Sequence, residues 1–278
     1  MKQVVIITGA SSGIGKATAL KLIQNGFQVY GLARRKQNMK EIEKAGGKVF
    51  ALDITNFSEV KLIIEKIFEQ EKRIDILINN AGFAIYGAVE ETSFEAAKKQ
   101  FDVNLFGLAE ITKAVLPIMR KQEKGKIINL SSIGGKIHSP LGAWYHASKH
   151  AVEGWSDCLR VEVKQFGIDV VIIEPGTIKT EFGKIRNQHF MQKKDSPYQN
   201  TIDSMREIIG NVYKEGNYSS PEIVAEIILK SIKAKNPKTR YLVGKKAKQT
   251  LFFRKILSDK TLDKAIFRML EKNKSNRK

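Results

Sequence analysis

The chain has 278 residues, of which 42% are hydrophobic and 28% charged, and 48 Lys and Arg against 29 Asp and Glu give a formal net charge of +19. This composition excludes a largely disordered chain, and the short apolar runs exclude a membrane-spanning helix, which needs about 18 or more consecutive apolar residues. The N-terminus lacks signal-peptide features and Cys158 is the only cysteine, so we expect a cytoplasmic protein without disulfides.

Short apolar segments alternate with longer segments of helical period along most of the chain. We expect strands near residues 3–8, 28–32, 48–52, 74–78, 126–130, 168–174 and 240–243. We expect helices near residues 14–25, 57–71, 94–121, 144–166 and 221–234, where apolar residues recur every three or four positions. Because the strands are nearly continuous apolar runs, this alternation predicts a parallel sheet with helices on both faces.

Two segments depart from the alternation. Residues 178–219 show no strand pattern and only a short helical pattern at 202–212, and long insertions of this kind in compact domains are usually lids or binding loops. Residues 245–278 carry apolar side chains at helical spacing among many lysines, which predicts two basic amphipathic helices. We therefore expect a single domain over residues 1–244, with a lid at 178–219, and a basic extension over 245–278.

The positive charge is concentrated at the C-terminal end. Residues 230–278 contain 17 Lys or Arg and only three acidic residues. Such a basic tail suits an anionic partner, such as nucleic acid, an acidic lipid surface or another protein, but a solvated lysine-rich surface is favoured over any specific partner. The Phe252-Phe253 pair favours core packing over base stacking and the tail matches no nucleic-acid motif, so nucleic acid is the least favoured partner.

A glycine-rich turn at residues 8–15 follows the first expected strand and opens the first expected helix. In this position glycines let the backbone approach a pyrophosphate, and the helix N-terminus offers free N–H groups to its charge. The turn therefore predicts a dinucleotide site whose contacts come from Gly9, Ser11, Ser12, Gly13, Ile14 and Gly15.

The end of the second expected strand predicts which dinucleotide binds. NAD-binding units place an acidic residue there, whereas this chain has Arg34 and Arg35. Because an arginine pair suits a 2′-phosphate, we expect NADP(H). Asp53, at the end of the third strand, could bind the adenine edge or could be a helix cap or turn residue before the helix at 57.

Tyr145 and Lys149 lie four residues apart, so a helix places them on one face. A nearby cation favours the phenolate of a tyrosine, which would let Tyr145 exchange a proton with an alcohol or ketone. Ser132 follows a strand, at the sheet edge where ligands bind in open parallel sheets, and could hydrogen-bond a substrate oxygen.

Together with these motifs, the sequence over residues 3–244 resembles that of the short-chain dehydrogenase/reductase family. The matching residues are the turn at 8–15, Asp53, 79–82, Asn104 within 102–104, Ser132, Tyr145, Lys149 and 175–178 with Thr180. The resemblance implies a Rossmann-like, doubly wound α/β fold with three layers and a helical lid.

The resemblance also implies the roles of individual residues. Tyr145 would be the general acid/base, Ser132 would polarise the substrate oxygen, Lys149 would lower the phenol pKa and bind the nicotinamide ribose, and Asn104 would hold a relay water. Further cofactor contacts would come from Ile54, Asn80, Ala81, Gly82, Pro175, Gly176, Thr177, Ile178 and Thr180. Residues 79–82 could instead stabilise the sheet, and Thr180 could cap a helix.

The expected reaction is NADP(H)-dependent interconversion of a secondary alcohol and a carbonyl. Residues 240–244 look like the hydroxysteroid and retinol dehydrogenase branch, which implies an apolar steroid-, retinoid- or lipid-like substrate. Five apolar residues could line its pocket or belong to the core: Leu141, Trp144, Phe182, Phe190 and Met191.

The remaining expectations concern partners and side chains without an assigned role. The four histidines show no metal-ligand spacing, and we expect no metal. We expect Cys158 to be a buried, small apolar residue. Related enzymes pair through the helices that would carry Asn104 and Tyr145, so a homodimer or tetramer is expected. The alternative function is that of a peripheral membrane protein, which docks its basic C-terminal helices on anionic lipid.

Overall fold

The computed structural model describes residues 2–180, 190–191, 193–214 and 216–275. Seven strands form one sheet in the order β3-β2-β1-β4-β6-β7-β9, and every neighbouring pair is parallel. The strands are β1 (Val4–Thr8), β2 (Gln28–Ala33), β3 (Lys48–Ala51), β4 (Ile76–Asn79), β6 (Gly125–Leu130), β7 (Ile168–Pro175) and β9 (Arg240–Val243). All of the strands expected from the apolar runs are therefore present.

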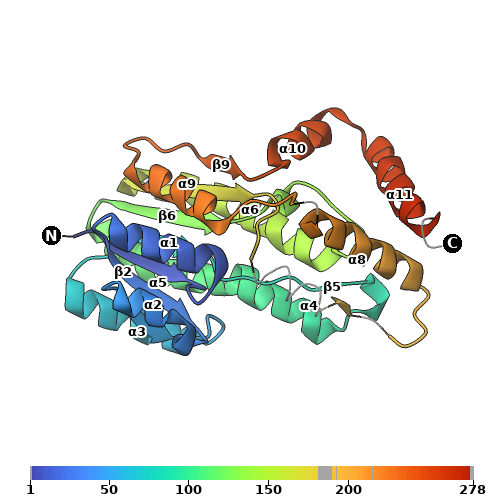
Figure 1. Cartoon of the computed structure of the whole chain (residues 1–278). Helices are drawn as coiled ribbons and strands as arrows, with labels where there is room; N and C mark the ends of the chain where they lie inside the picture. The colour runs from blue at the N-terminus through green and yellow to red at the C-terminus, as the bar shows by residue number, and fades with distance from the viewer. Residues whose placement is uncertain (1, 181–189, 192, 215, 276–278) are drawn as a thin grey trace.

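Helices cover both faces of this sheet (Figure 1). One face carries α1 (Gly13–Gln24), α2 (Lys40–Lys44) and α9 (Pro221–Lys233), and the other carries α3 (Phe57–Glu71), α5 (Gly107–Lys121) and α6 (Ala143–Val163). In β1, Val5 and Ile7 pack with the first set, whereas Val4 and Ile6 pack with the second. Successive strand side chains point to opposite faces, so one apolar strand serves two cores, and the expected three-layer α/β fold is confirmed.

Capping residues explain where several helices begin. Asn56 precedes α3 and accepts a hydrogen bond from the Glu59 N–H at 3.3 Å. Ser93 precedes α4 (Phe94–Phe101) and accepts one from the Ala96 N–H at 3.2 Å. Pro221 occupies the first turn of α9, where its missing N–H has no intrahelical partner to lose.

The helix expected over 94–121 is interrupted by a π-helical turn, Asp102–Phe106, between α4 and α5. Apolar periodicity does not predict such a turn, because one extra residue shifts the helix face only locally. The π-helical turn contains Asn104, which is almost completely buried.

The lid segment differs from the expectation. We expected no strand within 178–219, and this was wrong: β8 (Phe190–Met191) pairs in parallel with β5 (Tyr86–Gly87). Strands of two residues are too short to show a period of two in sequence. The helix expected at 202–212 is longer, forming α8 (Gln199–Lys214).

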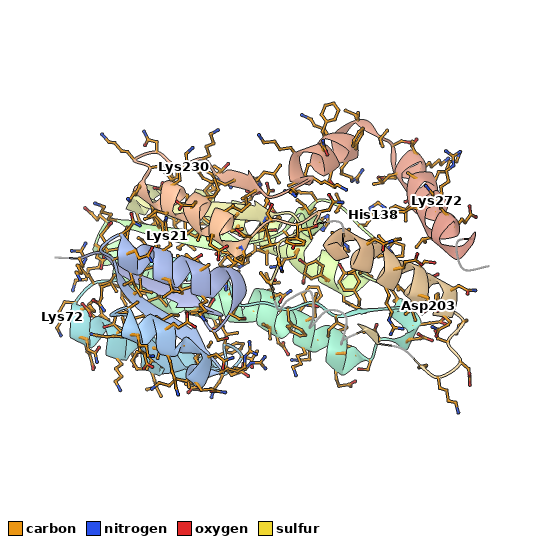
Figure 2. All side chains as sticks on the ribbon, viewed as in Figure 1. Lys21, Lys72, His138, Asp203, Lys230 and Lys272 are labelled. Atoms are coloured by element: carbon orange, nitrogen blue, oxygen red, sulfur yellow. The ribbon has the colours of Figure 1, made fainter. Side chains whose placement is uncertain are left out.

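We call residues 245–275 the C-terminal arm, which contains α10 (Ala247–Ile256) and α11 (Asp259–Ser275). The arm leaves the sheet after β9, and α11 packs beside α8 (Figure 1). His138, which is labelled in Figure 2, anchors the arm. Its Nε2 lies 3.1 Å from an Asp263 carboxylate oxygen. The two basic helices expected beyond residue 244 are thus confirmed. Among the described residues, none of the helices combines the length and apolar character needed to cross a bilayer.

Cys158 was predicted to be buried, and this was wrong, because it is exposed on α6. The apolar face of α6 that packs on the sheet includes Leu159 and Val163. A position adjacent to Leu159 points away from that face, because neighbouring helical residues are separated by about 100°.

Candidate active site

The glycine-rich turn is built at the carboxyl end of β1. Gly9 and Gly13 have positive φ angles of 67° and 53°, which side chains rarely allow. A Cβ on Gly9 would lie 2.9 Å from the Ala81 Cα, and a Cβ on Gly15 would collide with the Gly9 carbonyl oxygen. A Cβ on Gly13 would lie 3.1 Å from the side chain of Thr180. The turn therefore tolerates only glycine at these positions, and it faces the segment that follows β7.

Thr8 and Asn80 hold the turn to the end of β4. The Thr8 hydroxyl oxygen accepts hydrogen bonds from the N–H groups of Asn80 and Ala81, both at 3.0 Å. The Asn80 side-chain amide donates to the carbonyl oxygens of Thr8 and Gly9 at 3.0 and 3.2 Å. The side chain of Asn80 thus has the stabilising role that was one of the alternatives for residues 79–82. Its neighbour Asn79 donates to Thr112 and Asn129 within the sheet, each at 2.9 Å.

Two exposed arginines follow β2 beside the turn. One guanidinium N–H of Arg35 donates to the Ser12 hydroxyl at 3.4 Å, so Arg35 reaches the turn directly. The charge of Arg34 acts on Asp53 instead. Burial works to raise the Asp53 pKa, but the N–H and hydroxyl of Thr55 and the Arg34 cation together hold it below the ordinary aspartate value. Both arginines thus concentrate positive charge around the ends of β1 and β2.

The alternative roles considered for Asp53 can now be compared with its contacts. Its Oδ1 atom accepts hydrogen bonds from the N–H and the hydroxyl of Thr55 at 3.0 and 2.8 Å, which is a local turn. The helix-cap alternative was wrong, because Asn56 caps α3. A sequence with two capping residue types three positions apart does not itself decide which of them caps.

Ser132 and Tyr145 meet around a glycine. Ser132 precedes the 3₁₀ turn η4 (Ile133–Gly135), and its hydroxyl accepts the Gly134 N–H at 3.0 Å. A Cβ on Gly134 would lie 3.0 Å from the Tyr145 ring carbon Cε1 and 3.3 Å from the Ser132 hydroxyl. Gly134 therefore allows the hydroxyl of Ser132, after β6, and the ring of Tyr145, on α6, to approach each other.

His146 supports the arrangement of Ser132 and Tyr145 through the backbone of η4. Its Nδ1 lies 2.8 Å from the Gly134 carbonyl oxygen and its Nε2 lies 2.9 Å from the Ser139 hydroxyl. A carbonyl only accepts, so Nδ1 carries the proton and Nε2 accepts from Ser139. Burial lowers the His146 pKa, which keeps the ring neutral.

Lys149 lies one helical turn beyond Tyr145 and is only 7% exposed. Its ammonium group donates to the Leu130 carbonyl oxygen at 2.8 Å. Burial lowers its pKa from 10.5 to about 8, while the nearby Glu153 carboxylate opposes this change. Lys149 is thus a buried cation whose pKa of about 8 lies close to neutral pH.

Asn104 lies close to Lys149 through Gly82. A Cβ on Gly82 would lie 3.2 Å from the Asn104 Oδ1 and 3.8 Å from the Lys149 Nζ. The Asn104 amide donates to the Phe83 carbonyl oxygen and the Ser148 hydroxyl, each at 3.0 Å, and its Oδ1 accepts the Phe83 N–H at 3.0 Å. The π-helical turn directs Asn104 inward, as such turns often do at functional sites.

An apolar wall adjoins Tyr145. It consists of Ala84, Tyr86, Tyr145, Ile202, Met205 and Ile209, with Leu141, Tyr198, Ile208 and Leu270 packed against it. Of the expected pocket residues, Leu141 joins this wall, whereas Trp144 packs edge-on against Phe101 with ring centroids 6.4 Å apart. Phe182 and the side chains of Phe190 and Met191 lie outside the described residues.

Several residues around the site were not singled out from the sequence. They are Thr8, Gly134, His146, Ser148 and a cluster in which the partly exposed Lys136 and Arg240 meet the buried Glu153 and Glu174. One signal existed for Glu153, which lies four residues beyond Lys149 and hence on the same helix face. Contacts of Glu174 and Arg240 with that face depend on strand packing, which spacing does not reveal. Among the described residues, no group of His, Cys, Asp or Glu side chains is arranged to hold a metal ion.

Comparison with curated proteins identifies two relatives with named activities. The chain is 40% identical over 243 residues to a 3-ketodihydrosphingosine reductase of Bacteroides thetaiotaomicron, covering 87% of this chain and 88% of the relative. It is 33% identical over 276 residues to an NADPH-dependent 3-dehydrocapnine reductase of Ornithobacterium rhinotracheale, covering 96% of this chain and 97% of the relative.

Solved structures and family membership agree with these relatives. A short-chain dehydrogenase from Streptomyces avermitilis matches with a TM-score of 0.79 and 28% identity, covering 100% of this chain and 98% of that one. A variant of the actinorhodin polyketide ketoreductase with NADPH matches with a TM-score of 0.74 and 28% identity, covering 87% and 95%. The short chain dehydrogenase family matches residues 3–190. With this match, these relatives and the arrangement of Ser132, Tyr145 and Lys149, the chain belongs to the short-chain dehydrogenase/reductase family of oxidoreductases.

Proposed function

We propose that this protein is an NADP(H)-dependent oxidoreductase that interconverts a ketone and a secondary alcohol on a long-chain amphiphile. The observation that carries the reaction type is the approach of Ser132 and Tyr145 around Gly134, with Lys149 one helical turn away. A hydroxyl donor, a phenol and a buried cation at one sheet edge suit proton transfer to a carbonyl oxygen.

The side chains have distinct roles in carbonyl reduction. NADPH, when bound, would supply the hydride that reduces the carbonyl carbon. Ser132 hydrogen-bonds the carbonyl oxygen and orients it, and Tyr145 donates its phenolic proton to that oxygen as negative charge develops on it. The Lys149 cation favours the phenolate that remains on Tyr145. Three hydrogen bonds fix the Asn104 side chain near Lys149, where Asn104 would hold a water that returns a proton toward Lys149.

The residues of the turn and of the strand ends fit a dinucleotide. The glycines would let the pyrophosphate approach the N-terminus of α1, and Arg34 and Arg35 would face the adenosine 2′-phosphate. Further contacts would come from Ser11, Ser12, Ile14, Asp53, Ile54, Asn80, Ala81, Gly82, Pro175, Gly176, Thr177, Ile178 and Thr180. The two arginines, rather than a carboxylate, support NADP(H) over NAD(H).

The apolar wall beside Tyr145 and the two named relatives support the substrate class. Both relatives are named as reductases of a 3-keto or 3-dehydro compound, and one of these compounds is a ketodihydrosphingosine. The partly exposed side chains packed on the wall would contact an alkyl chain; they are Leu141, Tyr198, Ile208 and Leu270. The hydroxysteroid and retinol branch expected from residues 240–244 stays a prediction, and its substrates serve as the comparison in the test.

The test measures NADPH oxidation by the purified protein with four carbonyl compounds. These are 3-ketodihydrosphingosine, a steroid ketone, retinal and a short aliphatic ketone. We expect the highest kcat/KM for the first, a strong preference for NADPH over NADH, and almost complete loss of turnover in Tyr145→Phe with NADPH binding retained. Tyr241→Phe is the control, because among the described residues the Tyr241 hydroxyl accepts a hydrogen bond only from the Lys238 N–H. Full activity in Tyr145→Phe would refute the mechanism, and preference for the short ketone would refute the substrate class.

A second proposal concerns the C-terminal arm, which we propose docks on an anionic lipid surface. Five large apolar side chains of the arm are exposed, by 42–63%: Phe252, Phe253, Ile256, Phe267 and Met269. Residues 245–278 carry 12 Lys or Arg against three acidic residues. Exposed aromatic side chains beside lysines are typical of helices that lie in a membrane interface.

The position of the arm connects this proposal to the substrate. Leu270 of α11 packs against the apolar wall that adjoins Tyr145, and α11 packs beside α8. A bilayer bound by the arm would therefore lie close to the wall that would receive an alkyl chain. A cytoplasmic protein docked in this way could take up its substrate without releasing it into water.

Vesicle sedimentation tests the docking. We expect binding to vesicles that contain phosphatidylglycerol, weaker binding at high salt, and little binding to phosphatidylcholine alone. The triple variant Phe252→Ser, Phe253→Ser, Ile256→Ser should lose binding, whereas Leu62→Ser, at a 64% exposed position on α3, should not. Unchanged vesicle binding in the triple variant, or a change in oligomeric state alone, would overturn the proposal in favour of an interface between copies.

We further propose that two or more copies associate through the helices α4, α5 and α6. Of these helices, α4 exposes Phe94 by 74% and α6 exposes Val161 by 73%. Exposed apolar residues on neighbouring helices suit an interface. Light scattering of the wild type and of Val161→Glu tests this: the mass should fall to that of a monomer, and an unchanged mass would contradict it.

A further inference from the structure

Two carboxylates lie in the interior directly behind the candidate active site. Glu153 is one helical turn beyond Lys149 on α6, and Glu174 precedes Pro175 at the end of β7. Each is only 4% exposed. Neither has a role in the proposed reaction, and burying a carboxylate without compensation is strongly unfavourable.

Two cations approach this pair unequally. The Glu153 Oε2 lies 2.9 Å from the Lys136 ammonium and 3.1 Å from the Arg240 Nε. The Glu174 Oε1 is more distant from the same groups, at 4.0 Å from Lys136 and 3.6 Å from Arg240. Arg240 is shared further, because its Nη2 donates to Asp157 at 2.6 Å. The cations therefore neutralise Glu153 better than Glu174.

The Oε1 atoms of Glu153 and Glu174 lack hydrogen-bond donors among the described residues. Both of these atoms are buried. The two carboxyl groups lie close together, because the Lys136 ammonium and the Arg240 Nε are each within 4.0 Å of both. Two ionised carboxylates would leave both Oε1 atoms buried without a donor, whereas one added proton could bridge the two groups.

We propose that Glu153 and Glu174 hold one proton between their Oε1 atoms, with Glu153 ionised and Glu174 neutral, and that this pair positions Lys149 and the segment after β7. Burial and the neighbouring Glu153 carboxylate both raise the pKa of Glu174, in agreement with this assignment. The charged groups facing the pair are Lys149 and Asp157 on α6, Lys136 after η4, and Arg240 on β9.

The pair joins the elements that carry the active-site residues. A Cβ on Gly135 would lie 3.0 Å from both the Glu153 Cγ and the Lys149 carbonyl oxygen, so η4, which begins after Ser132, packs directly on this part of α6. Glu174 lies at the start of the segment expected to line the nicotinamide. The single negative charge of Glu153 favours the ammonium form of Lys149, and a second charge at Glu174 would strengthen that effect and disturb the packing.

Matched glutamine variants test the assignment. Glu174→Gln replaces a neutral hydrogen-bond donor with another, so the pH profile of kcat for carbonyl reduction should stay within twofold of the wild type at every pH. Glu153→Gln removes the ionised member, so the high-pH limb, where Lys149 loses its proton, should move to lower pH by about one unit. Glu162→Gln, at an exposed position on the same helix, is the control.

A second measurement is independent of turnover, because the kinetic arm relies on the proposed reaction. Infrared difference spectra of the wild type against Glu174→Gln at neutral pH should show the carbonyl band of one buried protonated carboxyl, which is absent in the variant. Absence of that band in the wild type would overturn the inference even if the enzyme is active. An equal shift of the pH profile in both glutamine variants would also overturn it, because both carboxylates would then be ionised.

Discussion

The lysine on α6 that lies in the candidate site is buried, whereas lysines of the C-terminal arm are exposed to water. Lys149 is buried, donates to a backbone carbonyl and has a pKa lowered to about 8. Lys255 and Lys264 of the arm are exposed to water. A charge in the interior acts strongly on its neighbours and destabilises the fold, whereas an exposed charge is screened and acts mainly by attracting an oppositely charged surface. The comparison teaches that burial, more than residue type, decides what a lysine does here.

Removing the buried cation should have the largest effect on the reaction. Lys149→Met fills a similar volume without a charge, so we expect kcat to fall by about 10²- to 10³-fold because the phenolate of Tyr145 loses its stabilising cation. Steady-state kinetics with NADPH and a keto substrate measure this effect. Lys264→Met in the arm is the control and should keep kcat within twofold. Comparable losses in the two variants would show that burial does not distinguish these lysines.

The same substitution should change how stability depends on pH. The folded-state pKa of Lys149 is about 8, below its ordinary value of 10.5, so the wild type bears the full penalty of a buried cation below pH 8 and none above about pH 10.5. The free energy of unfolding of the wild type relative to Lys149→Met should therefore rise by about 3 kcal/mol across this window. Urea unfolding at pH 7, 9 and 10.5 measures the difference, and parallel curves would contradict the assignment.

Arg34 and Arg35 are exposed like the lysines of the arm, yet they lie beside a turn that would hold phosphate. The double variant Arg34→Asp, Arg35→Ala should weaken NADPH binding by about 10- to 100-fold, since a charge-assisted contact contributes about 1.5 to 3 kcal/mol. NADH binding should change little or improve. Titrations followed by nicotinamide fluorescence give both constants, with Lys36→Ala as the control. Equal weakening for both nucleotides would mean that the arginines do not read the 2′-phosphate.

The smallest effect is expected where the arm meets the wall. Leu270 is only partly buried against the wall, so Leu270→Ser should raise KM for a long-chain ketone by about two- to threefold with kcat unchanged, because only part of one apolar side chain is removed. KM for a short ketone is the internal control and should stay constant. A parallel rise for both substrates would indicate that the arm acts on the protein as a whole.

Much of the fold and of the site follows from short-range patterns. The apolar runs predicted the strands. The glycine-rich turn was correctly predicted to join β1 to α1, and Tyr145 and Lys149 were correctly predicted to share one helix. The expectations that Cys158 is buried, that Phe252 and Phe253 pack in the core and that the lid contains no strand were wrong. Each of these depended on which way one side chain points or on a pairing of two residues, and neither is recorded in periodicity.

The sequence by itself determined the alternation of strands and helices, the glycine-rich turn after the first strand, and the shared helix face of Tyr145 and Lys149. Only the tertiary structure decided that Gly134 lies between Ser132 and Tyr145, that Lys149 has a lowered pKa, and that Glu153 on α6 and Glu174 on β7 share Lys136 and Arg240. Helix and strand periods are local properties of the chain. Burial and the fields between charges arise only when distant segments pack together and exclude water.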